Sequence, residues 1–129
     1  MTGPAIERLH TMQPVMEDVA QFLREEYERT PTVSFKDARN IRTEADVEAE
    51  AKIRTKLEQL FPKDAVYGEE GGLSGHKHPE GVWFVDALDG TTNFACGIPV
   101  FCAQIAYVKG EHVVLSIITV PLTGECFPA

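Results

Sequence analysis

The spacing of apolar residues predicts two helices in the first half of the chain. From about Ala5 to Arg29, apolar residues recur every three or four positions, which is typical of a helix with one buried face. Pro14 lies inside this run and lacks a backbone donor, so we expect a kink or a late helix start there, and Pro31 closes the run. The apolar residues that define the face are Ile6, Leu9, Met12, Met16, Val19 and Leu23.

A second helix is expected to begin at Thr43 and to end before Pro62. Thr43 can cap the first turn, and the acidic Asp46 three residues later favours a helix start. The segment that follows is rich in good helix formers. The residues expected in its buried stripe are Val47, Ile53, Leu57, Leu60 and Phe61. Between the two helices, residues 32–42 are expected to form a short strand or a loop.

The second half of the chain alternates short apolar runs with turn-forming residues, which predicts strands. The expected strands cover residues 65–68, 82–85, 101–108 and 112–120, and one more begins at Cys126. The glycine-rich segment 71–81 is expected to be a loop, and residues 109–111 a hairpin turn. Two helices followed by successive antiparallel strands predict an α+β fold, with helices packed on one face of a sheet.

Composition narrows the class of protein. The chain has 129 residues, of which 43% are hydrophobic and 25% charged, values typical of one soluble globular domain. Its formal net charge of −8 argues against direct nucleic-acid binding through a basic face. Three cysteines without CxxC spacing predict neither a disulfide framework nor a zinc site. No signal peptide opens the chain and no apolar run could span a bilayer, so we expect a cytoplasmic protein with no membrane partner.

The stretch FVDALDGTTNF, residues 84–94, contains the strongest candidate site. Asp86 and Asp89 flank an expected turn, with the carbonyl of Leu88 between them. Glu69 is expected to reach them from a neighbouring strand. Mg²⁺ prefers such oxygen ligands, and three carboxylates would repel one another without a cation. For the two aspartates alone, an acidic turn open to solvent is the alternative.

The next residues, Gly90, Thr91 and Thr92, could bind an anion beside this acidic group. If a helix starts there, its free N–H groups and dipole attract phosphate, and glycine allows close approach to the backbone. One metal ion could then stabilise the leaving oxygen and another could activate a water. A thiolate nucleophile at Cys96 is a weaker alternative, because no CxxxxxR loop accompanies it.

Taken together, these residues resemble the inositol monophosphatase family of Mg²⁺-dependent, lithium-sensitive phosphatases. The motifs that carry the resemblance are Gly68-Glu69-Glu70, WFVDALDGTTNF at residues 83–94, Thr43-x-x-Asp46 and Gly124-Glu125-x-Phe127. The resemblance implies a Mg²⁺ cofactor and a small phosphorylated substrate, with inositol monophosphate or a related compound hydrolysed by a metal-activated water. It also implies a homodimer.

The resemblance implies a role for each matching residue. Glu69 and Thr91 would position and activate the attacking water, with Asp46 supporting Thr91. Lys36 is expected to pair with Asp46. The implied Mg²⁺ ligands are Glu69, Asp86, Asp89 and the carbonyl of Leu88. The implied substrate-binding residues are Gly90, Thr91, Thr92 and Lys36.

Two features depart from the usual pattern of the family. Ala87 stands where the family usually has proline, which would stiffen the turn. Family members are also roughly twice as long, beyond the commonest size of a domain. Residues 1–129 are therefore expected to be the N-terminal α+β portion of a layered αβαβα sugar-phosphatase fold, with the C-terminal α/β portion outside this chain. The alternatives to catalysis are a noncatalytic regulatory or protein-binding role and an inactive fragment that self-associates.

Overall fold

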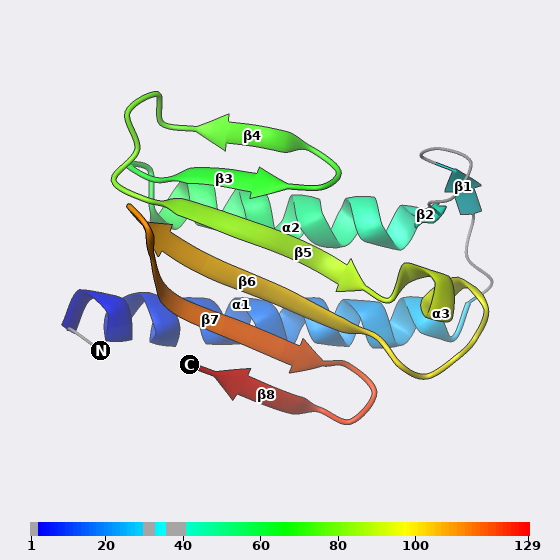
Figure 1. Ribbon diagram of the computed structural model, residues 1–129. Helices are drawn as coiled ribbons and strands as arrows, with labels where there is room; N and C mark the ends of the chain where they lie inside the picture. Colours follow the sequence, from blue (N-terminus) through cyan, green and yellow to red (C-terminus); the bar gives the residue numbers. More distant parts are fainter. Residues whose placement is uncertain (1–2, 30–32, 36–40) are drawn as a thin grey trace.

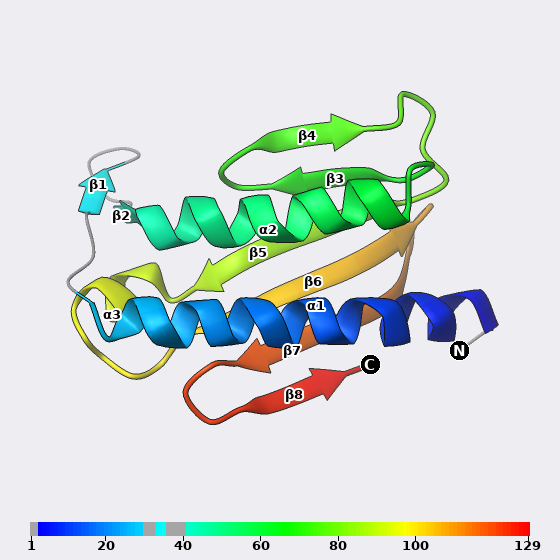
Figure 2. The ribbon, with the colours of Figure 1, turned by 180° about the vertical axis from the view of Figure 1, so that it is seen from behind.

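Two long helices lie side by side on one face of a six-stranded sheet (Figures 1 and 2). The computed structural model describes residues 3–29, 33–35 and 41–129. The helices are α1 (Gly3–Tyr27), α2 (Glu44–Leu60) and the short α3 (Thr91–Ala95). The sheet consists of β3 (Ala65–Gly68), β4 (Gly72–Gly75), β5 (Val82–Asp89), β6 (Cys102–Lys109), β7 (His112–Val120) and β8 (Glu125–Pro128). A separate antiparallel pair is formed by β1 (Val33–Phe35) and β2 (Ile41–Thr43).

The sheet has the order β4-β3-β5-β6-β7-β8 and is mixed. All neighbouring strands are antiparallel except β3 and β5, which are parallel. Helix α1 packs over β6 and β7, α2 packs over β3 and β5, and no described element covers the opposite face. The predicted α+β fold with helices on one face is confirmed. The parallel pair was not predicted, because it depends on β4 forming an edge hairpin before the chain enters β5.

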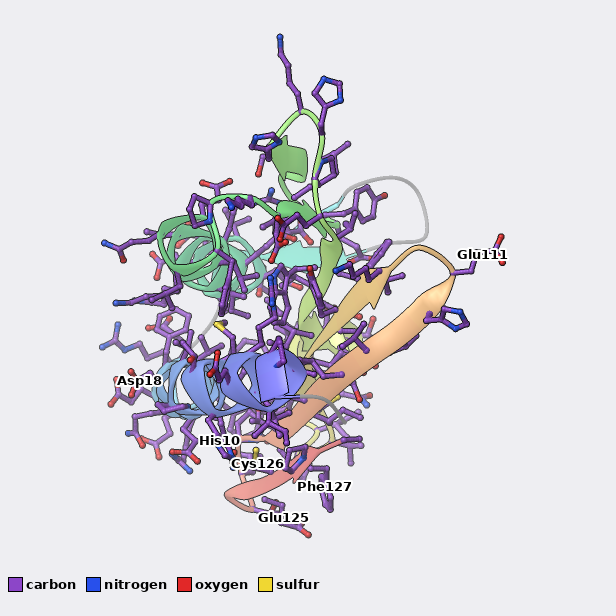
Figure 3. All side chains as sticks on the ribbon, turned by 90° about the vertical axis from the view of Figure 1, so that its left-hand side faces the viewer. His10, Asp18, Glu111, Glu125, Cys126 and Phe127 are labelled. Atoms are coloured by element: carbon purple, nitrogen blue, oxygen red, sulfur yellow. The ribbon has the colours of Figure 1, made fainter. Side chains whose placement is uncertain are left out.

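The core lies between the two layers, which Figure 3 shows edge-on. Alternate residues of each central strand point into it, as expected for a sheet with one covered face. The largest apolar side chains that the sheet contributes are Trp83, Ile105, Leu115 and Ile117, each at most 2% exposed. On β8, Cys126 is packed against the core, whereas Phe127 is 51% exposed (Figure 3).

Helix α1 buries most of the face that the sequence predicts, but Ile6 is 39% exposed, so the prediction is wrong at that position. Met12, Met16 and Leu23 are fully buried. The helix begins at Gly3 and continues through Pro14, so a late start is wrong. Pro14 lies on the exposed side, where water can bond the backbone carbonyl that loses its N–H partner. Among the described residues, no helix is both long enough and apolar enough to cross a membrane.

The buried face of α2 differs from the predicted stripe. Ile53 and Leu57 are fully buried as expected, but Val47 and Leu60 are each 42% exposed. The other residues that the helix buries are Ala45, Asp46, Ala49 and Glu50. The prediction failed at Val47 and Leu60 because carboxylates, which an apolar pattern does not reveal, occupy part of the inward face.

Two strands differ from those predicted. Residues Gly72–Gly75 form edge strand β4 inside the predicted loop, where the glycine content concealed the strand. Gly75 has a φ of +102°, and a Cβ there would lie 2.7 Å from the carbonyl oxygen of Asp64, so glycine is required. Strand β5 continues past Val85 to Asp89, which places both candidate aspartates within the strand.

A buried hydrogen-bond cluster fastens the helices to the sheet where β5 begins. Asp64 is 2% exposed and accepts hydrogen bonds from Trp83 Nε1 at 3.1 Å, Tyr107 OH at 3.0 Å and Arg8 Nη2 at 3.2 Å. The Arg8 guanidinium also lies over the rings of Phe61 and Tyr107, 5.0 and 4.6 Å from their centroids. The cluster therefore joins α1, the segment after α2, β5 and β6.

Replacing Asp64 with asparagine should lower the free energy of unfolding by about 3 kcal/mol, because it leaves the Arg8 guanidinium without its buried carboxylate. Urea unfolding followed by circular dichroism would measure the loss. Glu80→Gln is the control, because Glu80 pairs with Lys63 at 4.0 Å on the surface and its loss should cost less than about 1 kcal/mol. Equal stabilities for Asp64→Asn and the unchanged chain would contradict the role of this cluster.

The same cluster predicts a pH effect. Burial, and next the hydrogen bond to Asp64, raise the pKa of Tyr107 from 10.0 to about 12. The folded chain thus favours the protonated hydroxyl, and this stabilisation is present below pH 10.0 and lost as the pH rises to about 12. An absorbance titration of the three tyrosines should show a late-ionising component that is missing in Tyr107→Phe. Identical titration curves for the two proteins would be evidence against the shift.

Candidate active site

The parallel pairing of β3 and β5 brings two acidic residues to the same edge of the sheet. Gly68, the last residue of β3, lies opposite Val85 of β5. The next residue on each strand is an acid, Glu69 after β3 and Asp86 within β5. Both side chains border the same small depression. The structure therefore brings Glu69 beside Asp86 from a neighbouring strand, as the sequence analysis expects.

An irregularity in β5 places the two aspartates on a common side. Asp86 lies opposite Gln104 and Asp89 opposite Cys102, so three steps along β5 match two along β6. In a regular strand, residues three apart point to opposite faces, and one extra residue removes that difference. Gln104 hydrogen-bonds both aspartates, and its Nε2 lies 3.2 Å from Asp89 Oδ2. A single side chain thus reaches both carboxylates.

The electrostatic environment of Asp86 is unfavourable for its negative charge. Burial raises the pKa of Asp86, and the nearby charges of Asp89 and Glu69 raise it further. A smaller contribution of the same sign comes from Asp46, whereas the hydrogen bond from Gln104 acts in the opposite direction. A cation at this position would offset both the cost of burying the Asp86 charge and its repulsion by Asp89 and Glu69.

Helix α2 and helix α3 meet through one hydrogen bond. Thr91 Oγ1 donates to Asp46 Oδ1 at 2.8 Å and lies 3.2 Å from the carbonyl oxygen of Leu88. The other carboxylate oxygen of Asp46 accepts from the backbone N–H of Thr43 at 2.9 Å and from its hydroxyl at 2.6 Å. Thr43 and Asp46 form the predicted cap of α2, and both are buried. The cap therefore holds Asp46 in position to bind Thr91.

Gly90 makes the turn between the acidic strand and α3. Its φ is +92°, and a Cβ there would lie 2.9 Å from the carbonyl oxygen of Val100. A side chain at this position would be strained by both the backbone conformation and the contact. The helix that the sequence analysis allowed for begins directly afterwards, at Thr91, and has five residues.

The donor set at this edge of the sheet fits a hard cation. Among the described residues, no group of three or more His, Cys, Asp or Glu side chains is arranged to hold a metal ion. Mg²⁺, however, is commonly bound by one or two carboxylates together with waters and the phosphate of a substrate. The raised pKa of Asp86, caused by burial and neighbouring acids, is the observation that favours a cation here. Glu69 and Asp86 are the carboxylates that share the depression.

The other predicted site residues do not line this depression or lie outside the described residues. Asp89 is exposed and lies against Gln104. Thr92 is the exposed second residue of α3. Lys36, with its expected pairing to Asp46, lies outside the described residues.

The sequence analysis missed Glu50 and Gln104. Glu50 lines the depression together with Asp46, four residues earlier on α2. An Asp-x-x-x-Glu spacing puts two carboxylates on one face of a helix, which was the available signal. Gln104 gave no comparable signal, because its place beside the aspartates depends on the register of β5 and β6.

Comparisons with known proteins agree with these features. The sequence profile of the inositol monophosphatase family matches residues 7–129. Nus factor SuhB of Vibrio cholerae is 39% identical over 87 residues, which are 67% of this chain and 33% of that protein. The fructose-1,6-bisphosphatase/inositol-1-monophosphatase of Thermotoga maritima is 30% identical over 121 residues, 93% of this chain and 46% of that protein.

A solved structure extends the similarity to three dimensions. The extragenic suppressor protein suhB from Bartonella henselae matches with a TM-score of 0.90 at 30% identity, over 95% of this chain and 48% of that one. The chain therefore spans about half of the length of these relatives, or less. Since the family profile covers nearly the whole chain, the chain belongs to the inositol monophosphatase family.

Proposed function

We propose that residues 1–129 form the N-terminal, metal-binding portion of a Mg²⁺-dependent phosphatase that hydrolyses inositol monophosphate or a related small phosphomonoester. The observation that carries the proposal is the hydrogen bond from Thr91 Oγ1 to Asp46 Oδ1 at 2.8 Å, at the edge where the acidic residues gather. A buried carboxylate has no need of a partner from a separate helix for capping alone. The carboxylate oxygen of Asp46 that does not cap α2 accepts a hydrogen bond from Thr91, which fixes the Thr91 hydroxyl beside the acidic residues.

This hydrogen bond determines what Thr91 can do. Because the Thr91 hydroxyl donates its hydrogen bond to Asp46, its oxygen lone pairs are left to accept a hydrogen bond from water. Glu69, at the adjacent strand end, is the proposed base that orients the same water. Together these groups would hold the water in one orientation for attack on phosphorus.

The proposed Mg²⁺ ligands are Glu69, Asp86, Asp89 and the carbonyl of Leu88. When bound, Mg²⁺ would supply a Lewis acid and lower the pKa of a bound water. The proposed substrate-binding residues are Gly90, Thr91, Thr92 and Lys36. The backbone of the turn before α3 can approach a phosphate closely, because Gly90 has no side chain.

The substrate proposal draws on the names of relatives. The Thermotoga maritima relative is a fructose-1,6-bisphosphatase/inositol-1-monophosphatase, and a relative of 28% identity from Dictyostelium discoideum is an inositol monophosphatase. Both names denote enzymes that act on small phosphorylated polyols or sugars. We propose a substrate of the same class for this protein, and a cytoplasmic homodimer as its form.

A regulatory role is the second candidate. It is favoured by the name of the Vibrio cholerae relative, a Nus factor, which is 39% identical to this chain. The net charge of −8 makes a protein a better partner for such a role than a nucleic acid.

Phosphate release would test the catalytic proposal. The chain should release phosphate from inositol monophosphate or fructose 1,6-bisphosphate only with Mg²⁺, and lithium should inhibit the release. Asp89→Asn should weaken Mg²⁺ binding by about 10- to 100-fold or more, because it removes a charged ligand. Asp18→Asn is the matched control, because Asp18 is an exposed aspartate on α1 (Figure 3).

Calorimetry separates the remaining outcomes. Mg²⁺ binding without phosphate release would overturn catalysis by this chain alone and favour the regulatory role. Equal Mg²⁺ affinities for Asp89→Asn and Asp18→Asn would exclude Asp89 as a ligand. No Mg²⁺ binding by the unchanged chain would overturn the metal site itself.

A further inference from the structure

Glu50 is a buried carboxylate one helical turn after Asp46. It is 3% exposed, on the face of α2 that looks toward β3 and β5. Burying a carboxylate is costly unless hydrogen bonds replace the lost water. The hydrogen-bond partners of Glu50 therefore show which part of the structure its burial stabilises.

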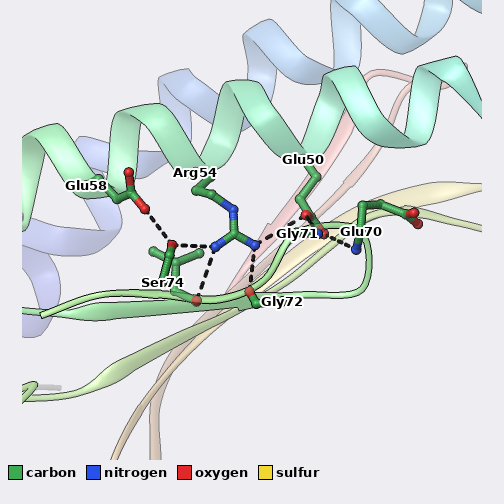
Figure 4. Close-up of polar contacts among 8 residues, drawn as sticks. Glu50, Arg54, Glu58, Glu70, Gly71, Gly72 and Ser74 are labelled. Carbon is green, nitrogen blue, oxygen red and sulfur yellow. Dashed lines mark hydrogen bonds and ion pairs between the residues drawn. The ribbon is translucent and has the colours of Figure 1, made fainter. Parts of the chain in front are cut away.

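Two of those partners are backbone N–H groups of the turn between β3 and β4 (Figure 4). Glu50 Oε1 accepts from the N–H of Glu70 at 3.0 Å, and Oε2 accepts from the N–H of Gly71 at 2.6 Å. These N–H groups belong to the two residues directly after Glu69. One carboxylate thus holds the main chain next to the proposed catalytic base.

Arg54, one further turn along α2, completes the attachment (Figure 4). Its Nη2 lies 3.3 Å from Glu50 Oε2 and donates to the carbonyl of Gly72 at 2.8 Å. Its Nη1 contacts the hydroxyl of Ser74 at 2.5 Å and the carbonyl of Val66 at 3.3 Å. Arg54 therefore balances the charge of Glu50 and binds both strands that flank the turn.

The glycines on either side of Glu69 and Glu70 reflect how closely Glu50 approaches. A Cβ at Gly68 would overlap the Glu50 carboxylate group. A Cβ at Gly71 would lie 3.0 Å from Arg54 Nη2 and 3.1 Å from Glu50 Oε2. The backbone at position 68 is not left-handed, so its conformation does not require glycine. Its small size is needed for the carboxylate that reaches past it.

We propose that Glu50 is a positioning residue for Glu69, a role that rests on the proposed function. Asp46 and Glu50 lie on one face of the same helix, four residues apart. Asp46 holds Thr91, and Glu50 holds the turn that carries Glu69. The spacing of the two carboxylates on α2 thus sets the distance between the proposed base and the proposed hydroxyl partner.

Glu50→Gln tests this role in the full chain. Glutamine keeps the size of the side chain, but its NH₂ group cannot accept from a backbone N–H. We expect faster hydrogen exchange at the amide of Glu70 or Gly71, and an affinity for Mg²⁺ about 10- to 100-fold weaker by calorimetry. If phosphate release is observed, kcat should fall more than KM changes.

Glu58→Gln is the matched control. Glu58 lies on the same helix and accepts a hydrogen bond from Ser74, in the same hairpin, at 2.5 Å (Figure 4). It is exposed, and its partner Ser74 lies within β4 rather than in the turn that carries Glu69. A general loosening of α2 against the hairpin would affect both variants, whereas positioning of Glu69 requires loss of Mg²⁺ affinity in Glu50→Gln alone.

Glu50→Asp tests the same positioning role if Glu50→Gln does not fold. Aspartate keeps the charge beside Arg54 but withdraws the carboxylate from the turn, so Mg²⁺ affinity should again fall. Unchanged Mg²⁺ affinity in a folded Glu50 variant, or an equal loss in Glu58→Gln, would overturn the positioning role while leaving the proposed function intact. Failure of the unchanged chain to bind Mg²⁺ would instead overturn the proposed function and, with it, this role.

Discussion

The placement of α2 is the constraint on which the candidate site depends. A buried carboxylate must find hydrogen-bond donors, and α2 buries two, Asp46 and Glu50. The donors of Asp46 come from Thr43 and Thr91, and those of Glu50 from Arg54 and the turn after Glu69. Because an α-helix rises about 1.5 Å per residue, the two carboxylates are offset by about 6 Å along its axis. The helix therefore adds a second alignment of the two halves of the site to the one made by the pairing of β3 with β5.

The C-terminal end of α2 is also attached to the sheet by a buried aspartate. Asp64, four residues beyond the end of the helix, accepts a hydrogen bond from Trp83 at the beginning of β5. The same strand carries Asp86 and Asp89 at its far end. Buried aspartates thus link α2 and the segment after it to the two ends of β5, Asp64 through Trp83 and Asp46 through Thr91, just beyond the end of the strand. A loss of either anchor should alter the angle at which β5 presents its carboxylates.

The sequence predicts what is local and misses what depends on long-range pairing. The spacing and type of residues predict most of the buried face of α1, the cap formed by Thr43 and Asp46, and the hairpin between β6 and β7, and the structure agrees. Strand β4 was missed because its glycines resemble a loop, yet it pairs with β3 along its whole length. The parallel pairing of β3 with β5 and the position of Gln104 depend on strand order and register, which short patterns do not encode. Glu50 was missed because a charged residue in a helix usually faces solvent.

The surroundings of Asp46, Glu50 and Asp64 differ from those of Asp86. Asp46, Glu50 and Asp64 are each surrounded by donors, and the last two are also paired with an arginine. Asp86 differs, because burial, and next the charges of Asp89 and Glu69, raise its pKa, with a smaller contribution from Asp46 among the described residues. The ionised form of Asp86 is therefore disfavoured in the folded chain, and a divalent cation would offset that cost. Within the part of the chain that the structure describes, three buried acids are satisfied by donors and Asp86 lies among like charges, an arrangement typical of functional sites.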